Sequence, residues 1–277
     1  MLLNYITWDV SPFIYEGEHF AIGWYGTLWV LGLLGMLITL LITFKHDGVP
    51  ASYAYVIFMI ALVCVIFFAH LFQGLFYEWY YAPNDPVHFL GTDWHYRNHY
   101  FEHPWKFLDF AHGGFASHGM IFGIIISSTI LSKLLNINKI YLVDRILMGA
   151  CWFGVTIRTG NLINAEICGV ETTMPWGFVF NDYPYALHPT QTYEMLVYLI
   201  VIGIVWYVYL KKDIGNQGGL ITGIVLTVTM SMRILIEFIK LPQMQIEQNW
   251  MLNMGQWLSI PFCIWGVYEL LSVLKNK

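Results

Sequence analysis

Residues 53–76 read YAYVIFMIALVCVIFFAHLFQGLF, a run that contains no aspartate, glutamate, lysine or arginine. A helix needs about 20 such residues to cross the hydrocarbon core of a bilayer, because each residue advances it by about 1.5 Å. The run is continuously apolar and does not alternate at a period of two, which excludes a strand of a membrane barrel. This stretch therefore predicts a transmembrane helix.

Six further runs approach or meet the same length, and each predicts another span. They cover residues 23–44, 114–135, 141–158, 189–210, 217–240 and 250–273. The run at 141–158 is the weakest of them, because Asp144 and Arg145 interrupt it. The sequence thus predicts an all-α polytopic membrane protein with about seven transmembrane helices, organised as one integral membrane domain over residues 1–277.

The composition agrees with this class of protein. Apolar residues make up 57% of the chain and charged residues only 11%, whereas soluble domains carry roughly a quarter charged residues. Lipid rather than water must therefore surround most of the exterior. The 13 basic residues are scattered among hydrophobic runs and the net charge is -5, which argues against a nucleic-acid partner.

The lysines between the spans predict the direction of the chain. Seven of them fall on one side of the predicted membrane: Lys45, Lys133, Lys139, Lys211, Lys212, Lys275 and Lys277. Because loops rich in lysine stay in the cytoplasm, we expect a cytoplasmic C-terminus and an external N-terminus. Two longer polar segments, 78–113 and 159–188, would then face outward. Residues 1–20 lack the pattern of a cleaved signal peptide, so we expect them to remain in the mature protein.

Four stretches carry polar groups at membrane depth, where each charge costs roughly 2.5 to 3.5 kcal/mol. They are HGGFASHGMIFG at 112–123, IRTGNLINAEICG at 157–169, LHPTQTYEM at 187–195 and RILIEFIK at 233–240. By the predicted topology, all four lie toward the outer ends of spans three to six. We expect them to converge on one cavity, open to lipid and to the exterior, of the kind that a phospholipid headgroup requires.

The stretch at 157–169 lies just outside the predicted fourth span. Arg158 and Asn161 are three residues apart and can share a helical face, which would place a guanidinium fork for phosphate beside an amide. An ion pair between Arg158 and Glu166 that fixes a loop explains the same residues equally well.

The stretches at 112–123 and 233–240 are also open to two interpretations. Arg233, Glu237 and Lys240 mark one stripe of a helix, as a ligand site or an internal ion pair would. His118 lies in the first turns of its span and serves either as a catalyst or as a hydrogen-bonded packing residue.

These stretches resemble the bacterial phosphatidylglycerol:prolipoprotein diacylglyceryl transferases over nearly the whole chain. The family signature GRxGNFxNxExxG appears as IRTGNLINAEICG, the HGG segment as SHGM, and RHPSQLYE as LHPTQTYE. Similarity continues in WYG at 24–26, in the R-x-x-x-E spacing of Arg233 and Glu237, and in MGQWLSIP at 254–261. Leu187 and Lys240 stand where the family has arginine.

The resemblance implies a transferase that moves the diacylglyceryl group of phosphatidylglycerol to the lipobox cysteine of a prolipoprotein signal peptide. A thioether forms, glycerol phosphate leaves, and no cofactor or metal is required. The expected location is the bacterial inner membrane. The resemblance assigns catalysis to Arg158, Arg233 and His118, with Arg158 and Arg233 holding the phosphate and His118 positioning or accepting the thiol proton. It assigns phosphatidylglycerol binding to Tyr25, Arg158, Asn161, Asn164, Glu166, Gly169 and Glu237.

Three other interpretations start from other residues. His95, His99 and His103 have helical i, i+4, i+8 spacing, which suits a metal-dependent membrane enzyme, although no HExxH motif is present. Seven helices with buried charges also suit a transporter, although the chain shows no inverted repeat. Cys168 lies in a polar stretch and is a weak candidate nucleophile, since no histidine or asparagine motif adjoins it.

Overall fold

The structure is a computed structural model that describes residues 5–84, 87–89, 92–111, 114–180, 183–211, 218–242, 244, 246–247 and 250–275. Within these residues, seven helices are long and apolar enough to cross a membrane, which confirms the predicted number. They are α1 (Trp24–Asp47), α2 (Ala51–Phe76), α4 (Ser117–Leu135), α5 (Lys139–Ile163), α6 (Thr190–Leu210), α8 (Leu220–Glu237) and α9 (Met254–Lys275).

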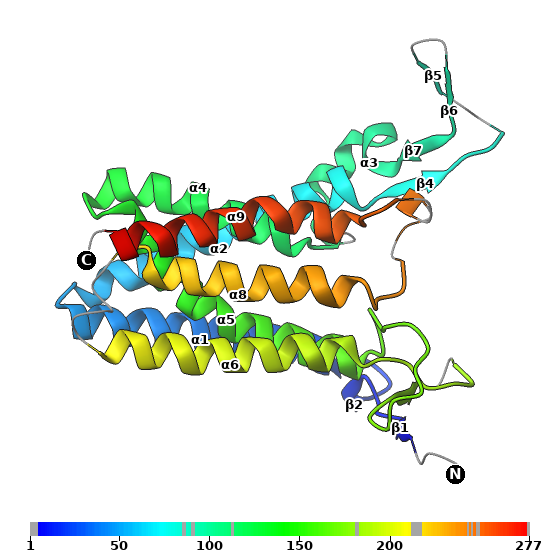
Figure 1. Cartoon of the computed structure of the whole chain (residues 1–277), viewed down its shortest axis with the longest axis horizontal. Helices are drawn as coiled ribbons and strands as arrows, with labels where there is room; N and C mark the ends of the chain where they lie inside the picture. Colours follow the sequence, from blue (N-terminus) through cyan, green and yellow to red (C-terminus); the bar gives the residue numbers. More distant parts are fainter. Residues whose placement is uncertain are drawn as a thin grey trace.

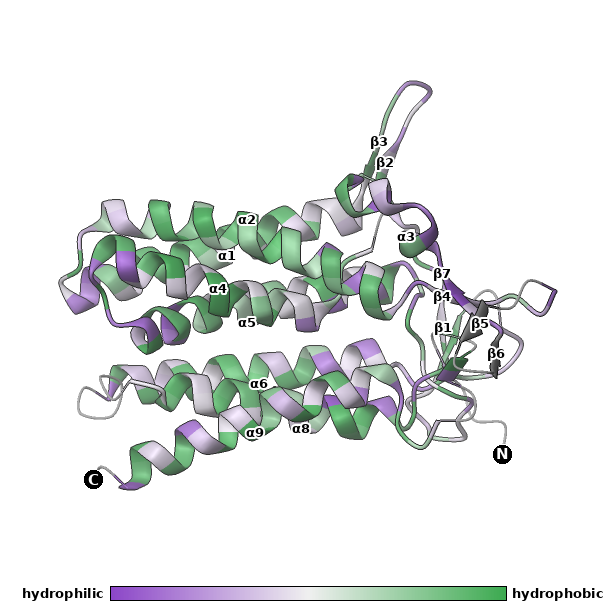
Figure 2. Ribbon diagram, turned by 90° about the horizontal axis from the view of Figure 1, so that it is seen from above, coloured by the Kyte–Doolittle hydropathy of each residue, from purple (hydrophilic) through white to green (hydrophobic). Residues whose placement is uncertain are grey.

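The helices run side by side and form two layers. In Figure 2, α1, α2, α4 and α5 lie on one side, and α6, α8 and α9 lie on the other. The buried core between them consists mainly of aliphatic side chains, including Leu40 of α1, Ile57 of α2, Ile146 of α5 and Ile221 of α8. The helices are green along their length and purple mainly near their ends, which is the hydropathy pattern of a membrane bundle.

The outer surface of the bundle is apolar as well. On α2, Met59, Val63 and Phe67 follow one another at a spacing of four and are 42–64% exposed. A helix that is apolar on its inner and its outer face belongs in lipid, since water would not tolerate the outer stripe.

Short strands gather at one end of the bundle, which is also the end of the N-terminus in Figure 1. β1 (Ile6–Trp8) pairs with β8 (Phe178–Phe180), β2 (Phe13–Glu16) with β3 (Ala21–Gly23), β4 (Trp79–Tyr81) with β7 (Tyr96–Asn98), and β5 (Val87–Phe89) with β6 (Thr92–Trp94). Each strand has three or four residues, whereas a transmembrane strand needs about 9–11. The strands therefore fold the connections, and the loop end is the name used below for this end of the bundle.

The opposite end holds the end of α9 and five of the described lysines, whereas Lys106 and Lys240 lie toward the loop end. Lys45 and Lys133 lie in the last turns of α1 and α4, Lys139 begins α5, Lys211 caps α6, and Lys275 ends α9. Lys212 and Lys277 lie outside the described residues. The gathering of these five lysines at one end agrees with the sequence prediction, while the direction across the membrane stays a prediction.

The fourth span differs from its prediction, because α5 continues to Ile163 rather than ending near residue 158. Its charged residues bind groups of other helices. Arg145 Nε lies 2.8 Å from Asp47 Oδ2 of α1, and Asp144 accepts hydrogen bonds from the backbone amides of Gly219 and Thr222 at 2.9 and 2.8 Å. The second long connection consequently begins near residue 164 and not at 159, so the prediction that the stretch after residue 158 lies outside the span is wrong for residues 159–163.

Candidate functional site

The last turns of α5 carry the first group of polar residues to the loop end. Arg158 is 8% exposed, and its Nη1 donates to Asn161 Oδ1 at 2.9 Å. Asn161 Nδ2 in turn donates to Glu166 Oε1 at 2.7 Å. The predicted sharing of one helical face by Arg158 and Asn161 is confirmed. The alternative partner is wrong, because Arg158 Nε pairs with Glu194 of α6 at 2.5 Å.

The turn after α5 adopts an unusual backbone. Ala165 and Ile167 have φ angles of 55° and 60°, a left-handed conformation that costs energy for residues with a Cβ atom. The first residues of α6 hold this turn in place. Thr190 Oγ1 donates to Ile167 O at 2.8 Å, and Gln191 Nε2 donates to Glu166 O at 2.5 Å. The two motifs at 157–169 and 187–195 therefore form one structural unit.

Gly169 connects this unit to the segment that follows α8. It forms a bridge with Lys240, and its amide donates to His188 O at 2.9 Å. A Cβ atom at position 169 would lie 2.7 Å from Ile239 O and 2.8 Å from His188 O, both backbone atoms. Glycine is required here because two other segments of the backbone approach closely.

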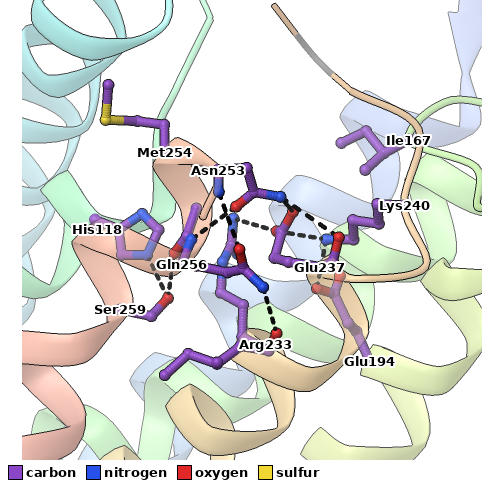
Figure 3. Close-up of polar contacts among 12 residues, drawn as sticks. His118, Ile167, Glu194, Arg233, Glu237, Lys240, Asn253, Met254, Gln256 and Ser259 are labelled. Atoms are coloured by element: carbon purple, nitrogen blue, oxygen red, sulfur yellow. Dashed lines mark hydrogen bonds and ion pairs between the residues drawn. The ribbon is translucent and has the colours of Figure 1, made fainter. Parts of the chain in front are cut away.

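The second group of polar residues comes from α8 and the residues after it (Figure 3). Arg233 Nη2 lies 3.4 Å from Glu237 Oε1, and Lys240 Nζ donates to the same oxygen at 3.0 Å. Lys240 also donates to Glu194 Oε1 at 2.7 Å. Burial lowers the pKa of Lys240, while the carboxylates of Glu194 and Glu237 oppose that shift. The predicted stripe of Arg233, Glu237 and Lys240 is confirmed.

Glu194 and Lys240 join the two groups into one network. Glu194 binds Arg158 of α5 and Lys240 from beyond α8, so three segments distant in sequence meet at its carboxylate. We name the set of Arg158, Glu194, Arg233, Glu237 and Lys240 the charge network. Neither Glu194 nor Lys240 is among the site residues predicted from the sequence. Their positions in LHPTQTYE and RILIEFIK were the available signal.

The start of α9 supports Glu237 from the other side. Asn253 Nδ2 donates to Glu237 Oε2 at 3.0 Å. At Gly255, a Cβ atom would lie 2.8 Å from the Glu237 carboxyl carbon, so the glycine lets the carboxylate lie against the helix. The MGQ motif at 254–256 therefore positions Glu237, and through it Arg233.

His118 of α4 is fully buried beside α9. Its Nε2 lies 2.9 Å from Ser259 Oγ (Figure 3), and its Nδ1 lies 3.5 Å from the hydroxyl of Tyr77. The Arg233 guanidinium lies close enough to the Tyr77 hydroxyl to favour its ionised form, so it works against the rise in the pKa of Tyr77 that burial causes. This chain of contacts connects His118 to the charge network.

A cavity of about 740 Å³ lies between the two layers of helices. Arg158, Asn161, Glu166 and Arg233 line it near the loop end. Its wall also follows α5 from Leu147 to Asn161, which spans about 21 Å at 1.5 Å per residue. Most of that length is apolar, with Met36 of α1, Ile124 of α4 and Leu226 of α8 on the wall. The prediction that Arg158 and Arg233 meet in one cavity is confirmed.

The remaining predicted site residues lie at different distances from this cavity. Tyr25 of α1 lines it and packs against Gly160. Asn164 caps α5 through its backbone and is exposed, while Glu237 and Gly169 support the site from behind the residues that line it. Their assignment to phosphatidylglycerol binding stays a prediction.

The alternative metal site does not form among the described residues. His99 begins the short helix α3 (His99–Glu102), but the residues before it form β7, so His95, His99 and His103 do not share a helical face. Within the described residues, no group of three or more His, Cys, Asp or Glu side chains is arranged to hold a metal ion. The geometric basis of the metal-enzyme interpretation is therefore wrong.

The chain is similar to known proteins that all belong to one family. The family model described as prolipoprotein diacylglyceryl transferase matches residues 12–272. A protein of Chloroherpeton thalassium named phosphatidylglycerol–prolipoprotein diacylglyceryl transferase is 32% identical over 275 residues, covering 99% of this chain and 96% of its own. Proteins with the same name from Porphyromonas gingivalis and Bacteroides fragilis are 34% and 31% identical, covering 98% and 100% of this chain and 96% and 98% of their own.

Proposed function

The chain belongs to the prolipoprotein diacylglyceryl transferase family, and from that premise we propose how its cavity transfers a diacylglyceryl group from phosphatidylglycerol to a prolipoprotein. The protein is a membrane transferase of the first step of lipoprotein maturation. In our proposal the acceptor is the thiol of the lipobox cysteine. Its sulfur bonds to the terminal glyceryl carbon of the lipid, the bond from that carbon to the phosphate oxygen breaks, and glycerol phosphate leaves.

The observation that carries the proposal is the pairing of two arginines at the polar end of an apolar cavity. Arg158 and Arg233 line the cavity near the loop end, while its deeper wall is formed by aliphatic side chains. A phospholipid has the same division, with a charged phosphate at one end and acyl chains that avoid water at the other. We propose that the phosphate lies between the two guanidinium groups and that the acyl chains follow α5.

The charge network suits this ligand electrostatically. Arg158, Arg233 and Lys240 contribute three positive charges, and Glu194 and Glu237 contribute two negative charges, so the network carries one net positive charge. The phosphodiester of phosphatidylglycerol carries one negative charge and would neutralise it. When the glyceryl carbon is transferred, further negative charge develops on the phosphate oxygen that leaves. Guanidinium donors fixed beforehand at that position stabilise the transition state.

The other predicted residues would support the two arginines. Asn161 hydrogen-bonds to Arg158 and Glu166, and Glu237 holds Arg233, so each fixes the orientation of a guanidinium group. We propose that Tyr25 and Asn161 contact the headgroup, that Asn164 and Glu166 shape its entrance while Gly169 supports the residues that line it, and that His118 accepts the thiol proton. No metal or cofactor takes part in this scheme.

The proposed location is the bacterial cytoplasmic membrane, with the loop end on the extracytoplasmic side. The described lysines at the opposite end support this direction, since lysine-rich ends stay in the cytoplasm. The site would then lie at the leaflet in which an exported prolipoprotein presents its lipobox.

The experiment that tests the proposal measures thioether-linked diacylglyceryl peptide formed from phosphatidylglycerol and a lipobox peptide. Arg158→Ala and Arg233→Ala should each lower kcat/KM by about 30-fold to 1,000-fold, the loss expected for a donor to a developing charge. Arg97→Ala is the matched control, because Arg97 pairs with Glu102 in the connection between α2 and α4. Near-full transfer by both arginine variants would refute the assignment of the phosphate site.

A further inference from the structure

His118 has no direct route to a substrate in the cavity. Its side chain is fully buried, and the part of the cavity wall that α4 supplies among the described residues is formed by Ser117, Met120, Ile121 and Ile124. A proton acceptor must lie within hydrogen-bond reach of the proton that it removes, directly or through one intermediary. A thiol in the cavity therefore needs an intermediary to reach His118.

Tyr77 occupies the position of that intermediary. It follows the last residue of α2, lines the cavity, and places its hydroxyl 3.5 Å from His118 Nδ1. The distance is at the outer limit of a hydrogen bond, and such catalytic contacts often tighten when substrate binds. Arg233, which belongs to the proposed phosphate site, lines the same cavity as Tyr77.

The hydrogen bonds around His118 fix which ring nitrogen can accept a proton. Ser259 Oγ donates to the backbone oxygen of Gly255 at 2.6 Å, so its own lone pair accepts from His118 Nε2, 2.9 Å away. The neutral imidazole then carries its proton on Nε2 and leaves Nδ1 as the acceptor. Nδ1 is the nitrogen that faces Tyr77.

We propose that the Tyr77 hydroxyl contacts the acceptor thiol and relays its proton to His118. This inference rests on the proposed function and adds a catalytic residue that the sequence analysis did not contain. The thiol S–H bond breaks as its proton moves to Tyr77 Oη, and the Tyr77 proton moves to His118 Nδ1. The thiolate then attacks the glyceryl carbon, and the imidazolium later returns one proton to the phosphate that leaves or to water.

The electrostatics of Tyr77 agree with a relay rather than with a free phenolate. Burial raises the pKa of Tyr77 to about 12, with Arg233 opposing the shift, so the hydroxyl keeps its proton at neutral pH. A hydroxyl that accepts one proton while donating another needs no charged intermediate of its own. The positive charge that appears on His118 is joined by the negative thiolate in the same step.

The test uses the full-length enzyme with phosphatidylglycerol and a lipobox peptide. Tyr77→Phe removes the hydroxyl and keeps the ring, so we expect kcat to fall by about 100-fold or more, as for loss of a general base. The KM for phosphatidylglycerol should change by less than about threefold, since the arginines that hold the phosphate remain. Tyr55→Phe is the matched control, because Tyr55 lies on α2, is 53% exposed and is not part of the described cavity wall, and it should retain wild-type kcat.

Two further measurements separate a relay from a structural role. Below the thiol pKa of about 8.5, the rate of Tyr77→Phe should rise about tenfold per pH unit as the peptide thiol ionises by itself. A peptide with selenocysteine in the lipobox, which ionises well below a thiol, should restore most of the lost kcat at neutral pH. A loss of kcat that is caused by misfolding of the variant would be restored neither by raised pH nor by selenocysteine.

The outcomes are distinct. Wild-type kcat in Tyr77→Phe, or a loss that neither raised pH nor selenocysteine restores, would overturn the relay while leaving the transferase function in place. Absence of transfer by the wild-type enzyme would instead overturn the proposed function. If Tyr77→Phe does not fold, 3,5-difluorotyrosine at position 77 keeps the shape and acidifies the hydroxyl. It should then shift the pH profile of kcat, and an unmoved profile would refute the relay.

Discussion

The carboxylate of Glu194, on α6, lies 2.5 Å from Arg158 Nε on α5 and 2.7 Å from Lys240 Nζ beyond α8. Its side chain is 6% exposed, so water screens these contacts little. A single carboxylate thereby fixes the separation between the helix that carries Arg158 and the segment that follows Arg233.

Replacement of Glu194 by glutamine should therefore reduce both activity and stability. The amide keeps the size of the side chain but leaves Arg158 and Lys240 without a shared counter-charge, and breaking a buried pair costs roughly 3 to 5 kcal/mol. We expect kcat/KM to fall by about 100-fold, because a displacement of about 1 Å at a catalytic group has that effect. Glu16→Gln, on the exposed strand β2, is the control for thermal unfolding and transfer assays. Wild-type kcat/KM in Glu194→Gln would contradict the positioning role.

Gly169 and Gly203 make an informative pair of substitutions to alanine. At Gly169 the new Cβ atom would meet backbone atoms of His188 and Ile239, and such overpacking typically costs about 1 to 3 kcal/mol. At Gly203, inside α6, no atom lies within 4 Å, so alanine should stabilise the helix by about 0.5 to 1 kcal/mol. Melting temperatures in detergent should move in opposite directions. A similar shift of the melting temperature in both variants would show that the close approach at Gly169 does not affect stability.

The helices were predictable because each depends on a local property, a long apolar run that only lipid can solvate. The end of α5 was not predictable in that way. Arg158 and Asn161 look like loop residues in the sequence, and they are tolerated in the helix because Glu194, 36 residues after Arg158, neutralises the arginine. The neutralising partner lies on another helix, so no window of sequence around residue 158 reveals it.

The role of Glu194 was not predictable from the sequence for the same reason. Polar residues at the start of a helix usually satisfy its free amides, and the pairing with Arg158 appears only once α5 and α6 are packed. The short strands escaped prediction because three residues carry no readable alternation. Tyr77, in contrast, could not be distinguished in the sequence from the aromatic residues that commonly mark the ends of membrane spans.

The surroundings of His188 predict that the stability of the fold decreases at acid pH. Burial lowers its pKa, and its Nδ1 contacts the hydroxyl of Tyr193 at 3.0 Å. Because the folded-state pKa lies below the unfolded value of about 6.5, unfolded chains bind the proton more readily as the pH falls below 6.5. The stability that neutral His188 contributes is complete above that value and is lost as the pH falls through the folded-state pKa.

The measurement compares melting temperatures at pH 7.5 and pH 5.0 for the wild type and for His188→Gln. The wild type should lose more stability than the variant over this interval, since glutamine does not titrate. His19, which is exposed on the connection between β2 and β3, provides the control variant His19→Gln, which should follow the wild type. Equal losses in the wild type and His188→Gln would contradict the expected contribution.

We expect Asp47 to contribute to the stability of the fold and not to the rate of transfer. At the end of the bundle opposite the charge network, its carboxylate accepts from Arg145 Nε at 2.8 Å and from the hydroxyls of Tyr141 and Tyr209 at 2.8 and 2.7 Å. The Arg145 guanidinium lies 4.5 Å from the ring centre of Tyr141 and 4.7 Å from that of Tyr209. Asp47→Asn leaves this buried cation unpaired, at a cost of roughly 3 to 5 kcal/mol. The melting temperature should then fall by about 6 °C or more.

The transfer rate of the folded fraction should nevertheless stay within about twofold of the wild type, because Arg158 and Arg233 keep their partners. Lys45→Gln, an exposed change in the same helical turn, is the control and should alter neither quantity. This pattern is the reverse of that expected for Tyr77→Phe, which should lose rate and keep stability. A variant at Asp47 that lost kcat at unchanged stability would mean that the lysine-bearing end of the bundle is coupled to the cavity, since Asp47, Tyr141, Arg145 and Tyr209 are not among the residues that line the described cavity.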